Sequence, residues 1–192
     1  MRRVCVTIQD FDEALNLLNH KLQKKELCIE IRAIGGYAML KWGIRKNGFT
    51  EDIDSVVKYK DEVVSLIEEV SDELHLQKDW LNSDSMNLIE VSSSIKKLTW
   101  VEVDGYSNIK MYVADARSLI LLKAKAIQYG GIVPRKTDKN DLVKLLSYNK
   151  IKGFDELLVS PEYESIKEFD RCLDILKELE SWKQITNSGK NK

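Results

Sequence analysis

Two aspartates, Asp52 and Asp54, stand two residues apart in a segment rich in β-branched residues. Side chains on a strand alternate between its two faces, so both carboxylates would project from one face, with Cα atoms about 7 Å apart. Like charges that close repel each other, and a bound divalent cation relieves the repulsion. Two carboxylates together with substrate phosphates commonly hold Mg²⁺. An exposed acidic strand edge is the simpler alternative, and the motif alone does not exclude it.

A pair of glycines, Gly35 and Gly36, stands at the junction of a predicted strand and a predicted helix. Glycine lets a polyanion approach the backbone, and the first N–H groups of a helix are available to phosphate. An ordinary turn would also use glycine. A strand that ends in Gly-Gly, then a helix, then a strand that begins Asp-x-Asp together describe a phosphate cradle facing a metal site.

One lysine, Lys123, lies in the middle of the apolar stripe of a predicted helix. At 100° per residue, five apolar residues fall within about 60° of it, namely Ala116, Leu119, Ile120, Ala126 and Ile127. An unpaired ammonium group there would be costly. Either the side chain extends to the edge of the core, or it contacts an anion such as a triphosphate or the Asp52 and Asp54 pair.

Two further acids, Asp138 and Asp141, are crowded together with basic residues in segment 135–141. Asp138 suits the N-cap of a helix whose first turn is acidic. A cap accounts for one acid and leaves the crowding unexplained. Asp141 is therefore a second candidate site residue.

Hydrophobic periodicity predicts the elements that position these residues. Apolar spacings of three and four predict helices over 10–25, 37–42, 61–75, 116–129, 138–148 and 161–183. Alternating and β-branched stretches predict strands over 27–34, 52–59, 98–103 and 109–113, the last two as a hairpin, and 87–91 admits another short strand. We expect an α/β (α+β) fold, a small mixed sheet of four or five strands flanked by helices over 1–114, then a helical part over 115–192, with the active cleft between the two.

The composition is that of an ordinary globular protein, with 43% hydrophobic and 32% charged residues among 192. No apolar run approaches the ~18 residues of a membrane span, and the start of the chain does not read as a signal peptide. A formal net charge of −1 argues against a strongly basic nucleic-acid binder. We expect a cytoplasmic protein without a membrane partner.

Cysteine and histidine are too scarce for the sites that they usually build. The chain has three cysteines, without a CxxC motif, and two histidines. Neither a disulfide framework nor a zinc cluster is predicted from these counts. Any metal would then be a hard ion held by carboxylates.

The run Ile34-Gly35-Gly36-Tyr37-Ala38, followed by Asp52-Ile53-Asp54, resembles the nucleotidyltransferase superfamily pattern of Gly-Gly/Ser, a spacer and Asp-h-Asp/Glu. Four segments are similar to the AbiEii-type, type IV toxin group and related uncharacterised nucleotidyltransferase-like proteins. They are Thr50-Glu51-Asp52-Ile53-Asp54, Trp80-Leu81-Asn82, Leu121-Leu122-Lys123 and 135–142. The resemblance covers about residues 27–146.

The resemblance implies a Mg²⁺- or Mn²⁺-dependent transfer of a nucleotidyl group from a nucleoside triphosphate to an RNA (tRNA) or protein acceptor, with an antitoxin partner if the chain is a toxin. By this resemblance, the aspartates bind the metal and the triphosphate, the glycines contact phosphates, and a lysine and an aspartate complete the site. Those roles fall on Asp52, Asp54, Gly35, Gly36, Thr50, Lys123, Asp138 and Asp141. A catalytically silent nucleotide-binding or protein-interaction module with the same fold is the alternative.

The chain departs from the family pattern at two places. Gly48 stands where family members often carry an arginine, which leaves Arg45 or Lys46 as substitutes. The superfamily also uses a third carboxylate as the base that activates an incoming hydroxyl. The sequence does not identify that acid, and the candidates are Glu90, Glu102 and Asp104.

Overall fold

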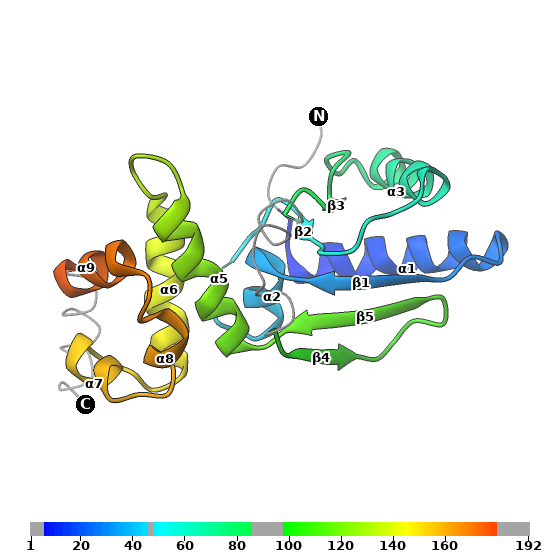
Figure 1. The fold of residues 1–192 in the computed structure, drawn as a ribbon. Helices are drawn as coiled ribbons and strands as arrows, with labels where there is room; N and C mark the ends of the chain where they lie inside the picture. The colour runs from blue at the N-terminus through cyan, green and yellow to red at the C-terminus, as the bar shows by residue number, and fades with distance from the viewer. Residues whose placement is uncertain (1–5, 46–47, 86–97, 180–192) are drawn as a thin grey trace, which may run out of the picture. The chain divides into compact units, whose positions relative to one another are not determined.

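The structure is a computed structural model that describes residues 6–45, 48–85 and 98–179. The chain divides into two compact units, Met1–Asp115 and Ala116–Lys192 (Figure 1). The first combines strands with helices, and the described part of the second is helical. The α/β class and the mixed sheet expected from the sequence are confirmed. Within the described ranges, no helix is both long and apolar enough to span a bilayer.

The first unit alternates helices with short strands. In chain order its elements are α1 (Ile8–Lys24), β1 (Ile29–Ala33), α2 (Gly35–Lys41), β2 (Ile53–Asp54), α3 (Asp61–Leu74), β3 (Leu81–Asn82), β4 (Trp100–Val103) and β5 (Ile109–Ala114). Helix α1 starts earlier than predicted because Thr7, rather than Asp10, is its N-cap and forms a capping box with Asp10. The hairpin expected from the sequence is the antiparallel pair β4 and β5.

The described strands form a three-stranded sheet in the order β1, β5, β4 and a two-stranded sheet of β2 and β3. Strands β1 and β5 are parallel, and so are β2 and β3. Between β1 and β2 there is a single antiparallel bridge, Ala33 to Ser55, in which Ile34 N–H donates to the carbonyl of Asp54 at 2.9 Å. This bridge sets the end of β1, and the glycines that follow it, directly beside Asp54. One face of the sheet is buried through register pairs such as Ile31 with Met111.

Strand β2 is two residues long, much shorter than the strand predicted over 52–59. The side chain of Ser55 accounts for the early end. Its Oγ accepts hydrogen bonds from the Val57 N–H at 3.2 Å and the Tyr59 hydroxyl at 2.8 Å. Local side-chain bonds of this kind compete with a strand ladder. The strand considered at 87–91 lies outside the described residues.

The second unit contains α5 (Ala116–Tyr129), α6 (Lys136–Tyr148), α7 (Phe154–Leu158), α8 (Tyr163–Ile166) and α9 (Asp170–Glu178). Helix α5 has the predicted bounds. The single helix predicted over 161–183 is wrong, because α8 and α9 are separate and Phe169 is the N-cap of α9. Residues 167–169 contain neither glycine nor proline, so the sequence gives no signal for that break.

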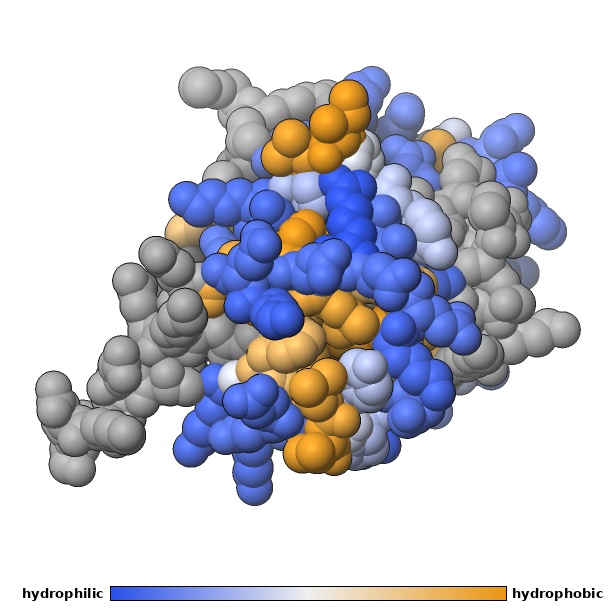
Figure 2. Space-filling view, turned by 60° about the vertical axis from the view of Figure 1, so that its left-hand side comes forward, coloured by the Kyte–Doolittle hydropathy of each residue, from blue (hydrophilic) through white to orange (hydrophobic). Residues whose placement is uncertain are grey.

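The loop between α5 and α6 is held by one side chain. The guanidinium of Arg171 donates to the carbonyls of Gln128, Gly131 and Ile132 at 3.3, 2.9 and 2.7 Å. Ile132 is nevertheless 99% exposed, and apolar patches lie among hydrophilic side chains on the face drawn in Figure 2. The loop therefore has a defined shape although its apolar tip is in solvent.

Trp80 connects β3 to the rest of the first unit. Its side chain is fully buried, and the indole N–H donates to the carbonyl of Ile67 on α3 at 3.0 Å. Its own carbonyl accepts from the Ile53 N–H of β2 at 2.7 Å. Trp80 therefore packs in the core of the first unit.

We predict that Trp80→Phe lowers the free energy of unfolding by about 1–3 kcal/mol, because it leaves a cavity and removes the indole hydrogen bond to the Ile67 carbonyl. Urea denaturation monitored by circular dichroism measures the change. The matched control is Trp100→Phe on the edge strand β4, where the tryptophan is half-buried and a smaller loss is expected. Equal losses in the two variants would contradict the structural role given to Trp80.

Candidate functional site

The first glycine of the pair lies directly against the Asp54 carboxylate. Gly35 has a φ of +65°, and a Cβ added to it would overlap Oδ2 of Asp54 and lie 3.4 Å from its Cγ. The left-handed backbone and the lack of space both exclude an ordinary side chain. Residues 35 and 54, which are distant in the sequence, therefore form one local structure.

The second glycine lies beneath Thr50 and Arg45. A Cβ at Gly36 would overlap the Thr50 hydroxyl and lie 2.8 Å from Nη1 of Arg45. Thr50 is fixed by a backbone bridge to Val6, with N···O distances of 2.9 and 3.2 Å. Arg45, one of the two substitutes considered for the arginine of the family pattern, thus lies beside the glycine pair. Lys46, the other substitute, lies outside the described residues.

Each aspartate of the pair receives a hydrogen bond from the segment that follows Leu81 in β3. The amide of Asn82 donates to Oδ2 of Asp52 at 3.0 Å, and the Ser85 hydroxyl donates to Oδ1 of Asp54 at 2.9 Å. Both carboxylates are partly buried. The sequence indicates Asn82 only as part of the segment Trp80-Leu81-Asn82, and it gives no signal for Ser85, because a lone serine carries no pattern.

The environment of Asp52 disfavours its charged form. Burial is the main cause, the charge of Asp54 adds to it, and the hydrogen bond from Asn82 opposes it, so the pKa of Asp52 rises from 3.8 to about 6. The two carboxylates are therefore close enough to interact. A bound cation would relieve this repulsion, so the donor set fits a hard divalent ion that also takes phosphate oxygens.

Among the described residues, no third acid lies with Asp52 and Asp54. No group of three or more acidic, histidine or cysteine side chains that could hold a metal occurs in this part of the chain. Glu102 is exposed on the edge strand β4, where it pairs in register with Tyr112. Asp104 is exposed just after that strand. Glu90 lies outside the described residues.

The remaining candidates lie together in the second unit. The ammonium of Lys123 contacts Asp138 Oδ1 at 2.8 Å and Asp141 Oδ2 at 3.0 Å. The side chain of Lys123 is 12% exposed, and those of the two aspartates are 3% and 4% exposed. Of the two alternatives for Lys123, contact with an anion is the one observed, and the anions are Asp138 and Asp141 instead of Asp52 and Asp54.

Asp138 is not the helix cap that its position suggested. Arg135 is the N-cap residue of α6, and Asp138 lies in the first turn with its carboxylate buried. Burial raises the pKa of this carboxyl, but the hydrogen bonds and charges of Lys123 and Arg135 outweigh it and hold the pKa below its ordinary value. The crowding of charges in 135–141 is therefore a neutralised cluster in which Arg135 contacts Asp138 at 2.8 Å.

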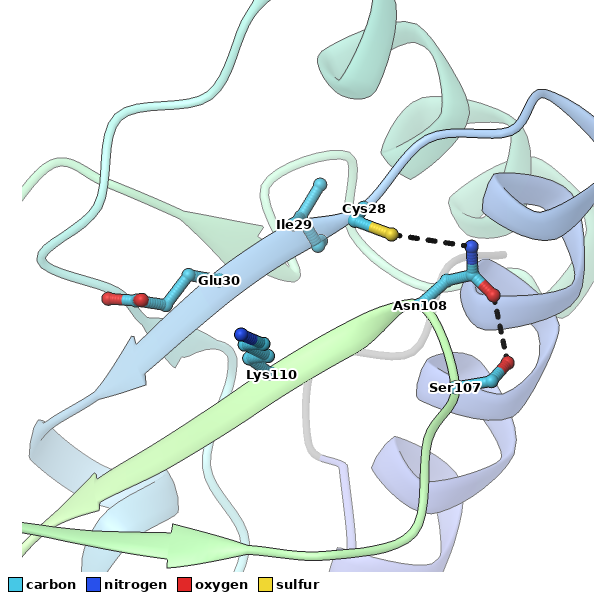
Figure 3. Close-up of a pocket in the computed structure, with 6 residues that line it drawn as sticks. All are labelled: Cys28, Ile29, Glu30, Ser107, Asn108 and Lys110. Carbon is cyan, nitrogen blue, oxygen red and sulfur yellow. Dashed lines mark hydrogen bonds between the residues drawn. The ribbon is translucent and has the colours of Figure 1, made fainter.

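A surface hollow lies at the other end of β1. It is lined by Cys28, Ile29, Glu30, Ser107, Asn108 and Lys110 (Figure 3). The amide of Asn108 donates to the Leu27 carbonyl at 2.8 Å and to Cys28 Sγ at 3.6 Å. The hollow begins where β1 starts, whereas the glycines follow its last residue, so it is separate from the aspartate pair.

Comparison with known proteins gives no further guide, because no family model, curated protein or solved structure matches the chain.

We predict that Gly35→Ala destabilises the first unit more than Gly43→Ala does. Gly43 has nearly the same φ, +66°, but a Cβ there would meet no atom within 4 Å. Gly43→Ala therefore measures only the cost of placing alanine in the left-handed conformation. At Gly35 the overlap with Asp54 should lower the free energy of unfolding by a further amount of about 1–3 kcal/mol. Chemical denaturation measures both variants. In the double variant Gly35→Ala/Asp54→Ala, part of the stability lost through Gly35→Ala should be recovered, because the overlapping carboxylate is gone. If the losses of the two single variants simply add in the double variant, the contact between Gly35 and Asp54 is contradicted.

We predict a pH-dependent effect of Asp52→Asn on stability. Because the folded protein raises the pKa of Asp52 from 3.8 to about 6, the contribution of this group is fully present below pH 3.8 and is lost as the pH rises through 6. The neutral variant escapes that loss and should be more stable than the wild type at pH 8 by about 1 kcal/mol, with no such gain at pH 4.

Urea unfolding at pH 4 and pH 8 tests this expectation. Glu102→Gln removes the same charge from the exposed strand β4 and serves as the control. A gain for Asp52→Asn that is equal at the two pH values, or no gain at pH 8, would contradict the assigned environment of Asp52.

Proposed function

We propose that the chain is a Mg²⁺-dependent nucleotidyltransferase that moves a nucleotidyl group from a nucleoside triphosphate to a hydroxyl of an RNA or protein acceptor. The observation that carries the proposal is the packing of Gly35 against the Asp54 carboxylate. It joins the glycine pair and the acidic pair in one place, as a triphosphate-binding centre requires. The raised pKa of Asp52 supports the same interpretation: burial is its main cause, and the charge of Asp54 adds to it.

In the proposed reaction the acceptor oxygen attacks the α-phosphorus. A new phosphorus–oxygen bond forms, the bond to the β-phosphate breaks, pyrophosphate leaves with the electron pair, and the hydroxyl proton is released to solvent. Asp52 and Asp54 would hold Mg²⁺, which when bound supplies positive charge to offset the charge of the phosphates. Gly35 lets the Asp54 carboxylate lie against the backbone where the helix α2 begins, and Arg45, close to Gly36, adds a positive charge.

A second candidate function is nucleotide binding without transfer. It is favoured by the lack of a third acid near the pair among the described residues, since that acid would activate the acceptor. The engagement of Lys123 with Asp138 and Asp141 also favours it, because an ammonium already neutralised by two carboxylates attracts a triphosphate less strongly.

We predict that label passes from at least one of the four α-³²P nucleoside triphosphates, with Mg²⁺ or Mn²⁺, into total cellular RNA or protein. The transfer should fall at least about 100-fold in the Asp52→Asn/Asp54→Asn variant, because the charges that hold the ion are gone. Digestion with ribonuclease or protease identifies the acceptor class. The control is Asp61→Asn/Asp72→Asn, which removes the same charge from exposed positions of α3.

Two results would contradict the transferase. One is label transfer that survives in the Asp52→Asn/Asp54→Asn variant, since another site would then be responsible. The other is Mg²⁺-dependent nucleotide binding without any transfer, which would establish the silent binding module instead.

A further inference from the structure

We propose that Asn82, assisted by Ser85, is the positioning residue of the aspartate pair, and that its amide occupies the place where a further carboxylate would join the centre. The inference rests on the proposed function, because it concerns the same metal site. It assigns a role to the segment after β3, which touches both aspartates.

The orientation of the Asn82 amide is fixed by its neighbours. Its Nδ2 donates to Asp52 Oδ2 at 3.0 Å and to the carbonyl of Asp79 at 3.2 Å, while its Oδ1 accepts from the Asp84 N–H at 3.0 Å. A flipped amide would set its oxygen against two other oxygens, so the donor must face Asp52. The backbone that supports it is the β2–β3 ladder, in which Asn82 is the register partner of Asp54.

The hydroxyl of Ser85 donates a hydrogen bond to the Asp54 carboxylate, as the Asn82 amide does to that of Asp52. It donates to Oδ1 at 2.9 Å, while Oδ2 of the same carboxylate is the atom that lies against Gly35. One short segment thus supplies a neutral donor to each acid. Such donors hold two like charges in place without a cation and without adding a third charge.

The chemical consequence is that an amide and a carboxylate at position 82 should behave oppositely. In Asn82→Asp, a third carboxylate would face Asp52 and the Asp79 carbonyl within hydrogen-bond distance, so the protein without metal should be less stable. The same carboxylate would be an additional oxygen ligand for a divalent ion, so the affinity for that ion should rise. A residue with only a structural role would not gain affinity from the change.

The test is the affinity for Mn²⁺ alone, measured by isothermal titration calorimetry, together with the melting temperature with and without Mn²⁺. Without Mn²⁺, we expect Asn82→Asp to have a lower melting temperature than the wild type. The variant should bind Mn²⁺ about tenfold more tightly, and Mn²⁺ should raise its melting temperature by more than it raises that of the wild type. Asn82→Ala should bind Mn²⁺ about tenfold more weakly. The matched control is Asn16→Asp, the same substitution on the exposed side of α1, which should leave the affinity unchanged.

The outcomes separate this inference from the function on which it rests. Mn²⁺ binding by the wild type, with no gain or a loss in Asn82→Asp, overturns the inference alone. Absence of Mn²⁺ binding in both proteins overturns the metal site and the inference together. If Asn82→Asp does not fold, Ser85→Ala should weaken Mn²⁺ binding several-fold and Ser85→Thr should restore it, and unchanged binding in Ser85→Ala would overturn the inference.

Discussion

The absence of side chains at positions 35 and 36 is the constraint on which the arrangement of the first unit's site depends. Gly35 admits the Asp54 carboxylate, and Gly36 admits Thr50 and Arg45. Because interiors are close-packed, a single methyl group at either position would move a side chain of the site. The backbone bridge between Ala33 and Ser55 holds β2 beside the end of β1. The position of Asp54 beside Gly35 is therefore fixed both by this bridge and by the lack of a side chain at Gly35.

The partly or fully buried carboxylates of the two units have different hydrogen-bond and ion-pair partners. In the second unit, Lys123 and Arg135 neutralise Asp138, so this carboxyl is stabilised as an anion. In the first unit, Asp52 and Asp54 receive the neutral donors of Asn82 and Ser85, and the pKa of Asp52 rises. Perturbed acids without a cationic partner are more often found at functional sites than in structural clusters. This difference directs the functional proposal to the first unit, while Lys123, Asp138 and Asp141 pair with one another in the second.

Residue type and periodicity predicted the class of fold, helix α5, the β4–β5 hairpin and the partnership of the glycines with the aspartates. Periodicity also indicated that Lys123 either extends to the edge of the core or contacts an anion, but it could not identify the partner, because Asp138 and Asp141 reach the lysine only through tertiary packing. The length of β2 was missed since the hydrogen bonds to Ser55 that end it are not visible as a pattern. The break between α8 and α9 lies in a stretch that keeps helical spacing, so no local rule signals it.

The most direct test of the central claim is a crystal structure with Mn²⁺ and a non-hydrolysable nucleoside triphosphate analogue, in which anomalous scattering locates the ion. We expect an anomalous peak at the carboxylates of Asp52 and Asp54, with the phosphates of the analogue next to Gly35. An ion and a nucleotide bound elsewhere, or a nucleotide bound without an ion at that pair, would contradict it.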